Sequence, residues 1–126
     1  MTEFTVHLAN RPGMLARLTE EIAGHGINIE ALAAFGVADQ GVVHLMVDDA
    51  ATTRAALKDA ALTFTEREVL TTMLPHEPGA VAAMAHRLAA ADVNIEAMYL
   101  LRSSAEGLEF AVAVDQPVTA RELAAS

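Results

Sequence analysis

Hydrophobic side chains near the start of the chain recur with a period of two residues. Phe4, Val6 and Leu8 alternate with more polar positions, which predicts a strand with one buried face. The period changes to that of a helix over residues 15–22. The apolar positions at this helical spacing are Leu15, Leu18 and Ile22. We therefore expect a strand followed by an amphipathic helix whose apolar face packs on the core.

The next segments alternate between strand and helix patterns and complete one unit. Residues 28–37 and 42–47 are rich in apolar side chains and are separated by a turn at 38–41. The acidic pair at 48–49 suits the start of a second helix, and residues 62–65 alternate again as a strand. The order strand-helix-strand-strand-helix-strand predicts a ferredoxin-like α+β unit, in which an antiparallel sheet has its helices on one face.

The same pattern occurs twice in the chain. Pro12 and Asn28 recur as Pro78 and Asn94, which lie 66 positions later (78 − 12 = 66). In both copies the Pro precedes the Asn by the same 16 positions (28 − 12 and 94 − 78). Further pairs at this offset are Gly41 and Gly107, Asp49 and Asp115, and Leu57 and Leu123. A match of this length without a gap predicts a duplicated unit.

We expect two ferredoxin-like repeats, residues 1–66 and 67–126, with almost no linker between them. Because the sequence ends at Ser126, the second repeat is predicted to lack its own last strand. One hypothesis is that residues 62–66 turn back against 69–74 and complete the second sheet, which leaves an open edge on the first. The alternative is a complete first repeat and a three-stranded second repeat.

Composition and charge narrow the possible functions. The formal net charge is −9, and the aromatic residues are only four Phe and one Tyr, so we expect no nucleic-acid binding. The chain has no cysteine, no secretory signal and no apolar run long enough to span a membrane, so we expect a cytoplasmic protein without membrane association. The usual metal-binding, nucleotide-binding and nucleophile motifs are also missing. We therefore expect no metal, no cofactor and no enzymatic activity.

The two Pro-Gly turns are the best candidates for binding chemistry. Each lies between a strand and a helix start, where unpaired backbone N–H groups and the helix dipole favour an anion. Gly13 and Gly79 let a carboxylate or phosphate approach the backbone. Asn28 and Asn94 either stabilise a turn or offer an amide to a zwitterion. The alternative interpretation of each Pro-Gly turn is a structural turn alone.

The strand-Asn-x-Pro-Gly-x-Leu turn at residues 10–15, followed by Gly-Ile-Asn-Ile at 26–29, resembles the ACT domain family. The resemblance covers both repeats and is closest to tandem ACT proteins without a catalytic domain. It implies a regulatory, allosteric protein that resembles the family in binding a free amino acid. The resemblance also implies a homodimer and a metabolic enzyme as partner. A protein-interaction or regulatory subunit that needs no ligand, and a small enzyme on the same fold, are the alternatives.

The resemblance to serine-regulated ACT domains implies ligand pockets between paired repeats, where Asn10 would act with Asn94 and His76 with Asn28. Two departures from that pattern are Leu8, which replaces a histidine, and His76, which replaces the turn asparagine. The ligand-binding residues that the resemblance implies are Asn10, Arg11, Pro12, Gly13, Met14, Leu15, Asn28 and Ile29 in the first repeat, and His76, Glu77, Pro78, Gly79, Ala80, Val81, Asn94 and Ile95 in the second.

Overall fold

The computed structural model describes residues 1–119 and 123. The chain divides into two compact units, Thr2–Glu68 and a unit formed by Met1 with Val69–Ser126. We call Thr2–Glu68 the first repeat and the chain from Val69 onward the second repeat, and each is described by itself.

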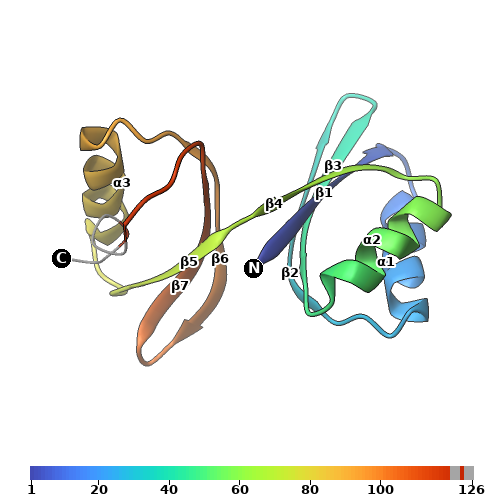
Figure 1. Ribbon diagram of the computed structural model, residues 1–126, viewed down its shortest axis with the longest axis horizontal. Helices are drawn as coiled ribbons and strands as arrows, with labels where there is room; N and C mark the ends of the chain where they lie inside the picture. Colours follow the sequence, from blue (N-terminus) through green and yellow to red (C-terminus); the bar gives the residue numbers. More distant parts are fainter. Residues whose placement is uncertain (120–122, 124–126) are drawn as a thin grey trace. The chain divides into compact units, whose positions relative to one another are not determined.

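The first repeat is a ferredoxin-like α+β unit, as expected. Its elements are β1 (Thr2–Ala9), α1 (Met14–Gly24), β2 (Ile29–Val37), β3 (Gln40–Val47), α2 (Ala50–Asp59) and β4 (Thr63–Glu68). The strands form an antiparallel sheet in the order β2-β3-β1-β4, and both helices cover one face of it (Figure 1). Asp49 caps α2, since its carboxylate accepts a hydrogen bond from the Thr52 N–H at 3.0 Å.

The hypothesis that the fourth strand completes the second sheet is wrong. β4 pairs with β1 of its own repeat, with Phe64 opposite Val6. Side chains of the two strands account for this choice. The rings of Phe4 and Phe64 are in contact at 6.0 Å between centroids, and Arg67 Nε donates to Glu3 Oε1 at 2.8 Å. The first sheet is therefore complete, which agrees with the alternative topology.

The second repeat repeats the same order up to its third strand. Its elements are β5 (Leu70–Leu74), α3 (Ala80–Ala90), β6 (Ile95–Ser104) and β7 (Gly107–Val114). They form a three-stranded antiparallel sheet in the order β5-β7-β6, which matches β1-β3-β2 of the first repeat. The second helix expected near Leu123 lies outside the described residues, except Leu123 itself. The carbonyl oxygen of Leu123 accepts a hydrogen bond from Thr72 Oγ1 at 2.7 Å.

The two repeats are not aligned without a gap, which corrects the sequence prediction. A β-bulge between Leu100 and Arg102 adds one residue to β6. The counterpart of Asp115 is therefore Asp48 and not Asp49. The hydrogen bonds agree, because the Asn28 N–H donates to Asp48 Oδ1 at 3.1 Å and the Asn94 N–H donates to Asp115 Oδ1 at 2.9 Å.

The predicted core face of α1 is confirmed at Leu18 and Ile22 and is wrong at Leu15. Leu15 and Val81 are about two-fifths exposed, at 41% and 42%, and do not belong to the core. The first residue of each helix, directly after the glycine, begins the stripe that packs on the sheet. The stripe continues at positions i+4 and i+8. The residues of these stripes are Met14, Leu18 and Ile22 in α1, and Ala80, Met84 and Leu88 in α3.

Candidate functional site

The turn from β1 into α1 has the backbone geometry of an anion-binding helix start. Gly13 has a φ of 87°, in the left-handed region, and is the N-cap of α1 without a side-chain cap. The N–H groups of Leu15 and Ala16 have no backbone acceptor among the described residues. Gly79 has the same φ of 87° at the start of α3. Both turns therefore expose unpaired donors at the positive end of a helix dipole.

Asn10 is fixed by two hydrogen bonds to the β2–β3 turn. Its backbone N–H donates to the carbonyl oxygen of Asp39 at 2.9 Å, and its Nδ2 donates to that of Ala38 at 2.9 Å. Ala38 itself adopts a left-handed φ of 54°. In the part of the chain that the structure describes, Asn10 Oδ1 has no donor. The amide is thus held in place while its oxygen stays available as an acceptor.

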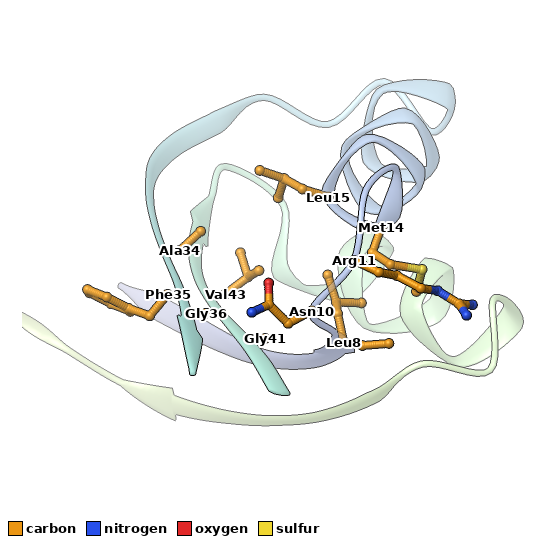
Figure 2. Close-up of a pocket in the computed structure, with 11 residues that line it drawn as sticks. Leu8, Asn10, Arg11, Met14, Leu15, Ala34, Phe35, Gly36, Gly41 and Val43 are labelled. Carbon is orange, nitrogen blue, oxygen red and sulfur yellow. The ribbon is translucent and has the colours of Figure 1, made fainter. Parts of the chain in front are cut away.

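A hollow of about 170 Å³ opens beside Asn10, between the start of α1 and the ends of β2 and β3 (Figure 2). Its lining side chains are mostly apolar: Leu8, Met14, Leu15, Ala34 and Val43. Gly36 and Gly41 pair with each other in β2 and β3 in this lining, and Gly36 leaves room for the amide of Asn10. Phe35 points away from the other labelled side chains, and its ring lies 6.2 Å from that of His44.

The lining of the hollow suits binding better than catalysis. It contains no carboxylate, imidazole, thiol or hydroxyl side chain that could serve as a base or nucleophile. Arg11 is the one charged residue of the lining, it is exposed, and it has no ion pair among the described residues. A ligand in this hollow would meet an amide, free backbone N–H groups and an apolar wall.

The corresponding part of the second repeat is built from different side chains. His76 and Glu77 replace Asn10 and Arg11, so the local charge of the turn is reversed. Neither side chain makes a hydrogen bond or ion pair within the described part of the chain.

The register of β6 and β7 shows what lies across from the His76 turn. Ser103 pairs with Leu108 at the position where Gly36 pairs with Gly41, and Leu100 pairs with Phe110 where Ala34 pairs with Val43. Each of these four residues of the second repeat has a larger side chain than its counterpart in the first. They are Leu100, Ser103, Leu108 and Phe110. Phe110 packs against the second core, as its smaller counterpart Val43 does in the first.

Asn28 and Asn94 have a structural role at the other end of each repeat. Their backbone N–H groups donate to the carboxylates of Asp48 and Asp115, as described above. In the opposite direction, the N–H of Asp48 donates to the carbonyl oxygen of Asn28 at 3.3 Å, and the N–H of Asp115 donates to that of Asn94 at 3.1 Å. The Asn28 side chain also donates to Asp48 Oδ2 at 3.3 Å. Sequence reasoning missed both aspartates, since they align only when a one-residue gap is allowed.

The remaining candidates are spread over both repeats. Ile29 begins β2 and is 38% exposed, whereas Ile95 packs against the second core. Pro12 and Pro78 each precede a left-handed glycine and lie in their turns. The described residues contain no group of three or more metal-ligating side chains. No described helix is long and apolar enough to cross a membrane.

Three surface carboxylates of the first repeat, Asp49, Glu66 and Glu68, have lowered pKa values, and two of them are held by contacts of α2. The hydrogen bonds from Arg54 lower the pKa of Glu66, with Nε and Oε2 only 2.7 Å apart. The hydrogen bond from the Thr52 hydroxyl, followed by that from the Thr52 N–H, lowers the pKa of Asp49. Neither of these two carboxylates lines the hollow, so neither is part of the site. Their lowered pKa values reflect hydrogen bonds that stabilise the fold.

Comparison with known proteins agrees with this architecture. Residues 2–62 match the model of the ACT domain family. A solved structure of a protein from Bacteroides thetaiotaomicron is 29% identical, with a TM-score of 0.82 over 91% of this chain and 79% of that one. The ligand-free regulatory subunit of aspartate kinase from Thermus thermophilus is 17% identical, with a TM-score of 0.68 over 90% and 81% of the two chains, which shows a shared fold. No curated protein matches the sequence.

Proposed function

We propose that this chain, an ACT-domain protein through its first repeat, senses a free amino acid that binds in the hollow beside Asn10. The single observation that carries the proposal is the anchored Asn10 amide, whose oxygen faces a site next to an uncapped helix start. The first repeat provides the site, and the second repeat provides a fold of the same kind with larger side chains at the corresponding strand positions.

Each part of a free amino acid has a partner of suitable chemistry in the hollow. The α-carboxylate binds the unpaired N–H groups at the start of α1, where the helix dipole favours negative charge. The ammonium group donates to Asn10 Oδ1, which has no other donor among the described residues. The apolar wall, with Leu8 and Val43, takes an aliphatic side chain. The exposed Arg11 adds positive charge near the carboxylate.

The ligand would act by shifting a population of conformations. It favours whichever arrangement of the protein closes on it, and the size of this effect equals the difference in its affinity for the two states. One fold neighbour is a regulatory subunit of aspartate kinase, which supports a similar regulatory role beside a metabolic enzyme. The cooperation of Asn10 with Asn94, and of His76 with Asn28, stays a prediction from the family resemblance.

A thermal-shift panel of the twenty L-amino acids tests the proposal. A true ligand at a hundredfold excess over its Kd stabilises the folded state by about 2.7 kcal/mol. We expect one or a few amino acids to raise the melting temperature of the wild-type chain. Asn10→Ala should abolish that rise, while His76→Ala, the matched control in the second repeat, should leave it unchanged. Equal responses from both variants, or no response from the wild-type chain, would contradict the proposal.

A second candidate function is subunit pairing that needs no ligand, and the exposed apolar side chains of β2 favour it. Leu32, Phe35 and Val37 are 39%, 59% and 73% exposed, and within the first repeat β2 pairs only with β3. Such an edge strand is a template for another strand. We expect a homodimer in light scattering, and Val37→Lys should weaken it. A monomeric wild-type chain at micromolar concentration would exclude this function.

A further inference from the structure

Gly36 lies directly beneath the side chain of Asn10, although its backbone does not require glycine. It pairs with Gly41 one position before the end of the β2–β3 ladder and does not have a left-handed φ. A Cβ atom built on Gly36 would lie 2.6 Å from Nδ2, 2.7 Å from Oδ1 and 2.8 Å from Cγ of Asn10. Glycine weakens a strand because it loses more conformational freedom than any other residue, so its use here needs a local reason.

The collision could not be relieved by a small movement of Asn10. The side chain is short, and its Nδ2 is bound to the carbonyl oxygen of Ala38 while its backbone N–H is bound to that of Asp39. The atoms that a Cβ would meet include Cγ, and with the backbone of Asn10 held by its bond to Asp39, Cγ moves away only if the side chain rotates about Cα–Cβ. Such a rotation breaks the hydrogen bond to Ala38 and moves Oδ1 to a different position.

We propose that Gly36 is a positioning residue, whose missing side chain lets Asn10 lie against β2 with its oxygen directed at the amino-acid site. This inference rests on the proposed function for its ligand, but the positioning of Asn10 can be observed without one. The second repeat supports it, because Ser103 occupies the corresponding position and His76 replaces the asparagine. The glycine and the asparagine are thus present together in one repeat and absent together in the other.

The first test uses the ligand-free protein. In Gly36→Ala, the side-chain amide resonances of Asn10 in a ¹H–¹⁵N spectrum should move and their protons should exchange with water faster, because the bond to Ala38 is lost. Gly24→Ala is the matched control, since a Cβ there meets nothing within 4 Å and Gly24 has no left-handed φ. It should leave the Asn10 resonances in place. Unchanged Asn10 resonances in Gly36→Ala would overturn the inference.

The second test is a double-mutant cycle on thermal stability. Gly36→Ala should lower the melting temperature in the wild-type background but not in the Asn10→Ala background, where the colliding side chain is gone. The cycle also covers the case in which Gly36→Ala alone does not fold, because Asn10→Ala with Gly36→Ala should then restore folding. An equal loss of stability in both backgrounds would show that Gly36 acts through something other than Asn10.

The third test connects positioning to binding and separates it from the proposed function. All twenty L-amino acids are tested as probes. For those that bind the wild-type chain, Gly36→Ala should raise the Kd at least tenfold, approaching the effect of Asn10→Ala. Gly24→Ala should leave the Kd unchanged. If no amino acid binds the wild-type chain, the proposed function fails while the spectra still decide the position of Asn10. If Asn10 moves and the Kd stays the same, Gly36 does not position a binding group and the inference is wrong.

Discussion

The two repeats share a backbone and a turn, yet they differ in what lies across from that turn. In the first repeat, Asn10 rests over Gly36 and a hollow of about 170 Å³ remains beside it. In the second, the opposing positions carry Leu108 and Phe110, and Phe110 packs against the core. The same Pro-Gly turn therefore stands in two different surroundings. The residues on the neighbouring strands are smaller in the first repeat than in the second.

The helix residue that faces the strands also differs in size between the two repeats. Met14 covers the glycine-lined end of the first sheet, whereas the smaller Ala80 stands above the bulkier strands of the second. Large and small side chains are thus exchanged between helix and sheet, a kind of change that cores tolerate when the total volume is kept.

The largest expected effect tests whether the two cores are equivalent despite their different sites. Ile22 and Leu88 occupy matching helix positions and are both fully buried. Ile22→Ala and Leu88→Ala should each lower the free energy of unfolding by about 2–5 kcal/mol, from lost burial and the remaining cavity. Chemical denaturation measures both. A cost below about 1 kcal/mol for Leu88→Ala alone would show that the second repeat contributes little packing energy and would break the comparison.

The sequence was sufficient for the element order and for the position of the two turns. Periodicity identified the buried positions of β1 and, except for Leu15, those of α1, and the Pro-Gly pairs located both helix starts within one residue. It could not choose the partner of β4, because alternation in Thr63–Glu68 is compatible with pairing on either side. That choice depends on contacts such as Phe4 with Phe64, which join residues far apart in the chain.

The bulge and the small residues of the hollow were missed for a related reason. The bulge at Leu101 follows from strand pairing and leaves no clear mark in an apolar stretch. Gly36 did give a signal, since a glycine within a strand often marks a close approach of another group. Only the folded chain shows that the group is Asn10, because 26 positions separate the two residues (36 − 10).

A smaller effect should follow from exchanging the charges of the two turns. Arg11→Glu gives the first turn the charge that Glu77 has in the second. It should raise the Kd of the bound amino acid about three- to tenfold, because exposed charges contribute up to about 1 kcal/mol each. Glu77→Arg is the matched control and should leave the Kd unchanged. Isothermal titration at two salt concentrations measures both, since screening should reduce the effect of Arg11→Glu. An effect equal in size for Glu77→Arg would place ligand at the second turn.

The smallest effect concerns the acid stability of the first repeat. Hydrogen bonds from Arg54 lower the pKa of Glu66 below its usual 4.5, so the unfolded chain takes up a proton before the folded chain does. The pair therefore stabilises the fold above about pH 4.5, and this contribution is lost as the pH falls through the lowered pKa. Glu66→Gln and Arg54→Gln should each flatten the melting-temperature profile in that acidic range, and the double variant should add nothing further. Parallel profiles for the wild-type chain and Glu66→Gln down to pH 3 would show that the ion pair does not anchor α2 to β4.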